Sequence, residues 1–281
     1  MQKGVRKMKA LAKTIIPWIV IILCVSGIFI YLYRNSDDTN AVQTENVYPG
    51  EWKVRDEYDT KGSGYEDFLK QKDSLKILNK VYKMLNSSDQ YREYSEQYLT
   101  YYKYFDGDSG FTKGSSLNNK EGKQYLTNLR VYQMPEKYMQ EKKIAENICK
   151  GRSFKKNEYQ RSLDKVIPVI AGYEYQKIFK LNEKIKGGYP GKGNYTYQIV
   201  GFLKKDSKLE SNKNLDKVLL IPTVIPGKDI KVSDQRVLMS IKCDGFFIYH
   251  NEKEWKEMVH LIKKIRRETG YRFVIPKTTQ D

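Results

Sequence analysis

One uninterrupted apolar segment near the start of the chain limits what the chain can fold into. The segment, Thr14–Tyr33, spans 20 residues and contains no charged side chain. As an α-helix it would rise about 30 Å, which is the thickness of the hydrocarbon layer of a bilayer. Trp18 lies near the start of the segment and Tyr33 at its end, as expected of aromatic residues that anchor a helix at the two membrane surfaces. The segment predicts a single transmembrane helix, with Ser26 and Gly27 as the small residues at which another helix would approach closely.

The charges on the two sides of this segment predict its orientation. Residues 1–13 contain basic residues and no acid, whereas Asp37 and Asp38 follow soon after the segment. Because basic residues are retained on the cytoplasmic side, we expect the N-terminus in the cytoplasm and the bulk of the chain outside, in a single-pass protein of the cell membrane. A cleaved signal peptide is the alternative, but its apolar core would be shorter, about 7–15 residues.

Composition divides the chain into four expected parts. Residues 1–13 are a cytoplasmic tail, 14–33 the transmembrane helix, 34–64 a polar stalk with little structure, and 65–281 an exterior domain. The formal net charge is +17, so anionic wall polymers and the lipid bilayer are the expected partners outside the cell. Nucleic acid is not normally present there and is not an expected partner. A lysine-rich surface in contact with water is the plainer interpretation of the charge.

Hydrophobic periodicity predicts an α+β exterior domain, in which helices pack on a mixed or antiparallel sheet. Apolar residues recur at helical spacing between Phe68 and Leu85, and with a period of two in 98–105 and 125–131. A long loop is expected at Asp106–Gly122. Further strands are expected at Val166–Ala171, Tyr195–Leu203, Lys217–Ile225 and Arg236–Tyr249.

The last predicted helix has the clearest boundaries. Asn251 and Glu254 are spaced as in a capping box, and Gly270 is placed as a C-terminal cap. Trp255 begins the apolar stripe that would face the core. His260 lies off this stripe and is expected on the surface.

No motif of the sequence predicts catalysis. Ser109 lies in a Gly-Asp-Ser-Gly motif like that of chymotrypsin-like proteases, but no histidine precedes it. His250 and His260 lack the spacing of a zinc site, and residues 187–193 lack the residue order of a phosphate-binding loop. We therefore expect no catalytic, metal or cofactor site and no enzyme. An anchored wall hydrolase stays an alternative, because 34 acidic residues offer many carboxylate pairs.

Three spaced segments resemble the exterior core domain of MacB-like and FtsX-like ABC transporter permeases. They follow MPEKYMQ and read ICKGRSF at Ile148–Phe154, VIPVIAGYEYQKIF at Val166–Phe179 and YTYQIVGFLKKDS at Tyr195–Ser207. They are similar to the family's Gly-Arg-x-Phe segment, to its strand, glycine and short helix ending in Phe, and to its strand ending in Val-x-Gly-Phe/Val-Leu. The matching positions are Gly151, Arg152, Phe154, Gly172, Phe179, Gly201 and Phe202.

The resemblance implies an α+β exterior domain on a transmembrane helix, working with a cytoplasmic ABC ATPase and a multispan membrane subunit. Such systems export or extract peptides and lipophilic compounds, or activate wall hydrolases. Three further spans follow this domain in the family and none follows Arg272, so we expect an incomplete permease or a detached exterior module. A non-catalytic permease-type subunit is the leading hypothesis for the function. A membrane-anchored binding or immunity module for cationic or lipophilic peptides is the alternative.

The motif residues also have expected structural roles that do not depend on the family. Gly151 and Gly172 are expected to allow backbone turns, and Phe154 and Phe179 to fill the core. Gly201, inside a strand, indicates a bulge or close packing.

Two side-chain interactions stay open at this point. Arg152 would either pair with an acid or face water. Cys149 and Cys243 would be able to form a disulfide outside the cell, but two cysteines alone do not establish its geometry.

Overall fold

The structure is a computed structural model that describes residues 49–58, 64–114, 116–189, 193–209, 213–227 and 230–275. The described residues up to Phe273 belong to one unit, Val47–Phe273, while Val274 and Ile275 belong to another. The larger unit contains the three sheets and all the helices named below. The predicted transmembrane segment Thr14–Tyr33, with Ser26 and Gly27, lies outside the described residues.

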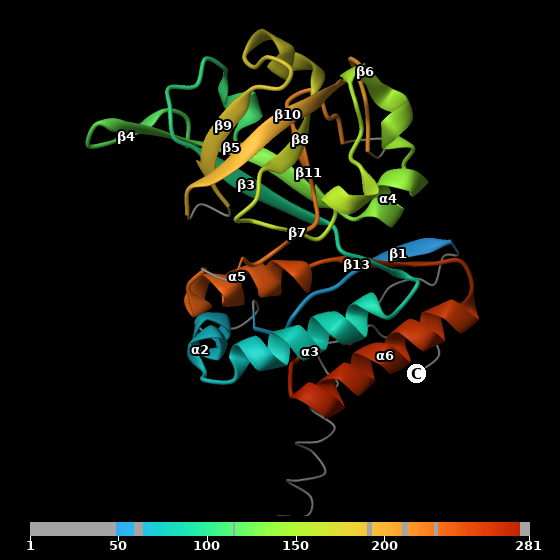
Figure 1. Ribbon diagram of the computed structural model, residues 1–281. Coiled ribbons are helices and arrows are strands. Elements are labelled where there is room, and N and C mark those ends of the chain that lie inside the picture. The colour runs from blue at the N-terminus through green and yellow to red at the C-terminus, as the bar shows by residue number, and fades with distance from the viewer. Residues whose placement is uncertain are drawn as a thin grey trace, which may run out of the picture. The chain divides into compact units, whose positions relative to one another are not determined.

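Six strands pair in a ring, so the central sheet closes on itself (Figure 1). The strands are β3 (Ser95–Tyr101), β5 (Gln124–Met134), β8 (Ile167–Ala171), β9 (Lys184–Gly188), β10 (Tyr195–Leu203) and β11 (Leu219–Pro222). β3 pairs antiparallel with β5 and β9, and β10 pairs antiparallel with β9 and parallel with β8. β11 completes the ring, antiparallel to β8 and parallel to β5. β4 (Asn119–Glu121) extends β5, and β6 (Ile148–Gly151) pairs with β10.

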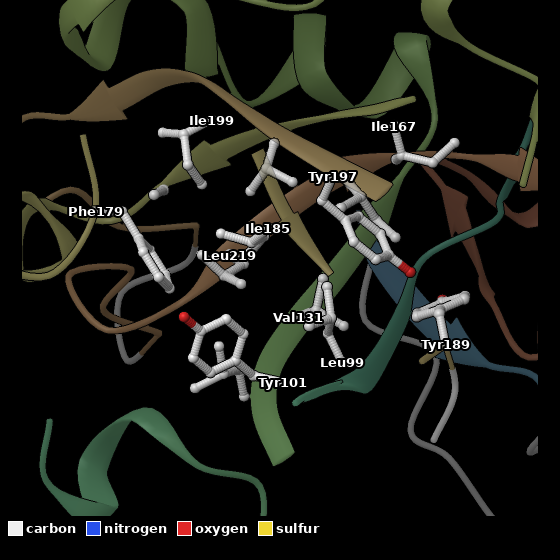
Figure 2. Packing of buried hydrophobic residues seen from close by; sticks show 14 of the residues in the cluster. Leu99, Tyr101, Val131, Ile167, Phe179, Ile185, Tyr189, Tyr197, Ile199 and Leu219 are labelled. Atoms are coloured by element: carbon white, nitrogen blue, oxygen red, sulfur yellow. The ribbon is translucent and has the colours of Figure 1, made fainter. Parts of the chain in front are cut away.

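Apolar side chains fill the inside of this ring (Figure 2). Because successive residues of a strand point to opposite faces, each strand contributes alternate residues to the interior. The interior includes Leu99, Tyr101, Val131, Ile167, Ile185, Tyr197, Ile199 and Leu219 from the six strands, and Phe179 and Tyr189 from their connections. A closed sheet of six strands is therefore packed with side chains throughout.

A second layer combines a three-stranded antiparallel sheet with four helices. The sheet has the order β1 (Gly50–Lys53), β13 (Phe246–Tyr249) and β2 (Tyr91–Arg92). The helices are α2 (Gly64–Lys70), α3 (Ser74–Asn86), α5 (Val232–Lys242) and α6 (Glu252–Thr269). Trp52 stands opposite Phe247 on one buried face of the sheet. Lys53 stands opposite Phe246, so the two side chains share the other face.

Shorter elements lie along the chain between β3 and α5. They are the helix α4 (Glu136–Glu141), the parallel strand pair β7 (Arg161–Ser162) and β12 (Val224–Ile225), and the 3-10 helices η1 (Ser109–Phe111), η2 (Ile144–Asn147), η3 (Lys156–Glu158) and η4 (Tyr173–Lys177).

The last helix, α6, begins and ends where the sequence predicts. The side chain of Asn251 accepts a hydrogen bond from the backbone N–H of Glu254 at 3.0 Å, and the Glu254 carboxylate accepts one from the N–H of His250 at 2.7 Å. Gly270 ends the helix in the left-handed region with φ of 72°. Trp255 is buried and His260 is exposed, as expected.

One predicted strand is wrong. Residues Arg236–Tyr249 divide into the end of α5 and the strand β13, separated by Cys243, Asp244 and Gly245. Val237, Leu238, Met239 and Ile241 form an apolar run that fits a helix as well as a buried strand. Leu238, Met239 and Ile241 are buried in the helix, so tertiary packing decides the outcome.

The predicted stalk at 34–64 also differs from the structure. β1 lies inside that range and pairs with β13 along its whole length. The expected helix between Phe68 and Leu85 is two helices, α2 and α3, which are separated by a turn. The folded unit therefore includes residues before Tyr65.

The predicted fold class, an α+β domain with a mixed or antiparallel sheet on a single transmembrane helix, requires correction. The unit is α+β, but its main sheet is a closed ring of six strands with both parallel and antiparallel pairs. Among the helices of the described ranges, none combines the length and apolar character needed to cross a membrane. The fold is closed because β11 reaches β5, a pairing between strands far apart in the sequence.

Replacing Gly201 with Ala is expected to destabilise the fold by about 1–3 kcal/mol, because an added methyl group would overpack the contact between β10 and β6. A Cβ at Gly201 would lie 2.5 Å from the backbone oxygen of Arg152. Urea denaturation measures the change. Gly64→Ala is the matched control, since its Cβ would meet nothing closer than 3.8 Å, and equal stabilities of the two variants would contradict the prediction.

Candidate functional site

A cavity of about 450 Å³ lies where the three-stranded sheet meets the start of β3. We name it the interlayer cavity. It is lined by Glu51, Lys53, Tyr94, Glu96, Gln97, Lys113, Lys213, Asp244, Gly245 and Phe246. The residues belong to β1, to β3 and the residue before it, to β13 and the two residues before it, and to two loops. The cavity therefore belongs to both layers of the unit.

Two aromatic rings, Tyr94 and Phe246, supply the apolar part of this lining. Their centroids are 5.8 Å apart in an edge-to-face arrangement. Both rings also pack edge-to-face against Tyr138, which is fully buried. Such pairs are rigid and present large apolar surfaces. The aromatic floor is thus held in place by the core beneath it.

The charged side chains of the interlayer cavity carry both signs. Lys53 and Asp244 form an ion pair of 3.5 Å, and Glu96 lies 3.7 Å from Arg130. The ammonium group of Lys213 stands 5.2 Å from the centroid of the Tyr94 ring, a cation–π distance. Acidic and basic groups are therefore available side by side around an aromatic floor, which suits a ligand that carries both apolar and charged groups.

A buried ion pair lies next to residues of this cavity along the chain. The ammonium of Lys242, at the end of α5, lies 2.6 Å from the carboxylate of Glu93, and both side chains are 2% exposed. Lys242 also donates to the backbone oxygen of Val224 at 3.0 Å. The Glu93 carboxylate accepts from the Tyr82 hydroxyl at 2.8 Å and from the Gln133 amide at 3.4 Å. The network joins α3, α5, β5 and β12.

The protonation of this network follows from its burial. Burial raises the pKa of Glu93 above its ordinary value, although the ammonium of Lys242 acts in the opposite direction. Burial also raises the pKa of Tyr82 and of Cys243, the residue after Lys242. The Tyr82 hydroxyl is therefore a neutral donor and the Cys243 thiol stays protonated. Tyr94, the residue after Glu93, and Asp244, two residues after Lys242, both line the interlayer cavity.

The motif residues predicted from the sequence gather elsewhere. Gly151 has φ of 83°, and a Cβ there would lie 2.3 Å from the backbone oxygen of Val200. Gly201 stands opposite Gly151, at a register shift between β10 and β8. Gly172 lets the chain approach Leu215, whose oxygen would lie 2.0 Å from an added Cβ.

The aromatic motif residues pack into the core. Phe179 and Phe202 are buried inside the ring, and the Phe179 ring stacks on Tyr175 at 5.7 Å. Phe154 is half-buried and meets Tyr159 edge-to-face at 5.9 Å. None of the described motif residues lines the interlayer cavity, so their observed role is structural.

Arg152 pairs with an acid. Its guanidinium donates to both carboxylate oxygens of Glu158 at 2.8 Å. Burial opposes ionisation of Glu158, but the hydrogen bonds from Arg152 and from the backbone N–H of Lys155 lower the pKa of Glu158 below its ordinary value. This bidentate pair fixes the turn after β6.

The remaining reactive side chains are separated. Cys149 is exposed and Cys243 is buried, and each is a free thiol, so the disulfide considered from the sequence is not formed. His250 pairs with Glu254 at 3.0 Å at the start of α6. In the described part of the chain, no group of three His, Cys, Asp or Glu side chains could hold a metal ion.

Sequence reasoning missed the residues of the interlayer cavity. Lys53 falls in the expected stalk and Asp244 in the wrongly predicted strand. A usable signal was present: in 51–55 the apolar residues Trp52 and Val54 alternate with charged residues, as in a half-buried strand. Asp244 followed by Gly245 is a turn signal between two apolar runs.

No protein-family model, curated protein or solved structure matches this chain. The resemblance to permease exterior domains therefore stays a prediction.

Replacing Lys242 with Met is expected to destabilise the fold by about 3–5 kcal/mol at pH 8, because the carboxylate of Glu93 loses its buried partner. The loss should shrink as the pH falls toward 5. With its pKa raised by burial, Glu93 takes up a proton in the folded state, and the buried charge disappears. Urea denaturation across this pH range measures both effects.

Lys253→Met is the matched control for this prediction. Lys253 lies on α6 in an exposed pair with Glu257 at 3.9 Å, so its replacement should cost less than about 1 kcal/mol at any pH. A pH-independent loss in Lys242→Met would show that Glu93 is not the group responsible.

Proposed function

We propose that this chain is a non-catalytic binding module that holds an extended peptide in the interlayer cavity. The observation that carries the proposal is the combination of an aromatic floor with charges of both signs in a cavity of about 450 Å³. That volume lies within the range of about 300–1,000 Å³ found for ligand sites. A peptide supplies side chains for the rings and polar groups for the charges.

The proposal keeps what two hypotheses from the sequence have in common. Permease-type systems of the family that the chain resembles act on peptides or lipophilic compounds, and the alternative binding module takes cationic or lipophilic peptides. Both require a surface that recognises a peptide without changing it. Coupling to an ATPase or to a multispan subunit stays a prediction. The wall hydrolase also stays a prediction.

The rigid part of the cavity supports binding of a partner. Tyr94 is held by three edge-to-face contacts, with Tyr132, Tyr138 and Phe246. A ring fixed in this way loses little conformational entropy when a ligand covers it, so more of the contact energy remains as affinity. Aromatic residues of this kind are enriched at binding sites for the same reason.

Filling the interlayer cavity is expected to weaken peptide binding. Glu51 is an exposed residue of β1 that lines the cavity, and Glu51→Trp would place an indole inside it. The probe is a fluorescein-labelled peptide with two tyrosines and one lysine, added to the full chain and followed by fluorescence anisotropy. The variant should bind it at least about tenfold more weakly than the wild type, a change of about 1.4 kcal/mol.

The control variant is Glu121→Trp. Glu121 is an exposed strand residue of β4 and lines neither this cavity nor the second one described below. Its replacement should leave the affinity unchanged. Equal binding by both variants, or no binding by the wild type, would refute the proposed function.

A further inference from the structure

A second cavity, of about 430 Å³, lies among the strands and helices of the second layer. We name it the rear cavity. Its lining comes from the end of β1 and the residues after it, from α2, from the end of α5 and the residues after it, and from the segment that follows α6. All of these residues belong to the larger unit. The volume lies within the range of about 300–1,000 Å³ found for small-molecule sites.

Three of the four charged side chains in this lining already have partners. Lys53 and Asp244 form an ion pair of 3.5 Å. The carboxylate of Asp56 accepts hydrogen bonds from the Tyr271 hydroxyl at 3.2 Å and from a backbone N–H at 3.0 Å. The fourth charged group is the guanidinium of Arg55, and no side chain or backbone group of the described ranges binds it. The rear cavity therefore offers one cation that nothing neutralises.

The backbone that carries Arg55 is held on both sides. The N–H of Val54 donates to the oxygen of Gly245 at 2.9 Å, and the N–H of Glu57 donates to the oxygen of Arg272 at 3.0 Å. Only the side chain of Arg55 is left to adjust to a ligand. Such preorganisation reduces the entropy that is lost on binding.

The apolar wall of the rear cavity is aromatic and equally fixed. Tyr271 and Phe273 are buried, and their ring centroids are 4.8 Å apart. The Tyr271 ring also meets Phe68 edge-to-face at 5.2 Å, and its hydroxyl is tied to Asp56. Fixed rings of this kind present edges and faces that favour another aromatic ring.

We propose that the rear cavity binds a small aromatic monocarboxylate, whose carboxylate pairs with Arg55 and whose ring packs against Tyr271 and Phe273. A guanidinium presents two parallel N–H groups that match the two oxygens of a carboxylate. This site and its ligand differ from the interlayer cavity and its peptide, so the proposal does not rest on the proposed function.

The charges of the lining select a single negative charge. Arg55 neutralises one charge of a ligand. The second charge of a phosphate monoester would face the carboxylates of Asp56 and Asp244, which line the same space. A cationic ligand would instead face Arg55 itself.

The test measures the binding of 2-naphthoate to the full chain by ligand-observed NMR titration. Two further probes are 2-naphthylmethylamine, which is cationic, and cyclohexanecarboxylate, which keeps the carboxylate without an aromatic ring. The variants are Arg55→Met, which removes the guanidinium, and Arg55→Lys, which keeps the charge without the fork. Arg267→Met is the matched control, because Arg267 is an exposed residue of α6 that lines neither cavity.

The wild type should bind 2-naphthoate with a Kd of about 1 mM or tighter. Arg55→Met should bind it at least about tenfold more weakly, Arg55→Lys should lie between the two, and Arg267→Met should match the wild type. The cationic probe should bind the wild type at least about tenfold more weakly than 2-naphthoate, and cyclohexanecarboxylate about threefold or more weakly. Urea denaturation of Arg55→Met should match the wild type, since the Arg55 side chain is exposed.

Several results would overturn the proposal. They are no binding of 2-naphthoate by the wild type, equal binding by Arg55→Met, and equal binding of either of the other two probes. A loss of 2-naphthoate binding in Glu51→Trp would also refute it, because Glu51 lines the interlayer cavity and not the rear one. The peptide assay uses another ligand, so the proposed function and this site fail independently.

Discussion

The ion pair between Glu93 and Lys242 holds the two layers of the unit together. Its partners belong to different elements: Glu93 follows β2, Lys242 ends α5, and their further hydrogen bonds reach α3, β5 and β12. Taking two charges out of water costs several kcal/mol per ion, and only complete hydrogen bonding offsets this cost. The network supplies that bonding, so the helical layer has one favoured position on the closed sheet.

The packing around the closed sheet depends on a different constraint, the close approach of backbones. Gly151 and Gly201 let β6 pack against β10, and Gly172 lets the chain pass Leu215. Side chains at these positions would collide with the backbone oxygens of Val200, Arg152 and Leu215. Around the ring, large residues such as Phe202 and Tyr197 fill the inside. The motif segments thus determine how β6 and the chain after β8 pack around the ring, whereas the charged residues outside it line the cavity.

Local signals predicted the elements that depend on local interactions. The capping residues Asn251 and Gly270 define α6 in any tertiary setting, and the alternation in Tyr195–Leu203 marks β10. The helix at Val232–Lys242 was missed because its apolar run has no single period, so packing decides its structure. The ring was missed because its closing pair, β11 with β5, joins distant segments. The cavity was missed for the same reason, since Lys53 and Asp244 meet only after folding.

The molecule contains two kinds of ion pair, the buried pair of Glu93 and Lys242 and the exposed pair of Lys53 and Asp244. The buried pair has no access to water, so breaking it leaves an unpaired charge in the core. The pair of Lys53 and Asp244 faces water, so its partners exchange for other charges at little cost. Lys242 and Asp244 are two residues apart along the chain. The buried pair therefore fixes the backbone that carries Asp244. The exposed pair can rearrange without disturbing the fold beneath it.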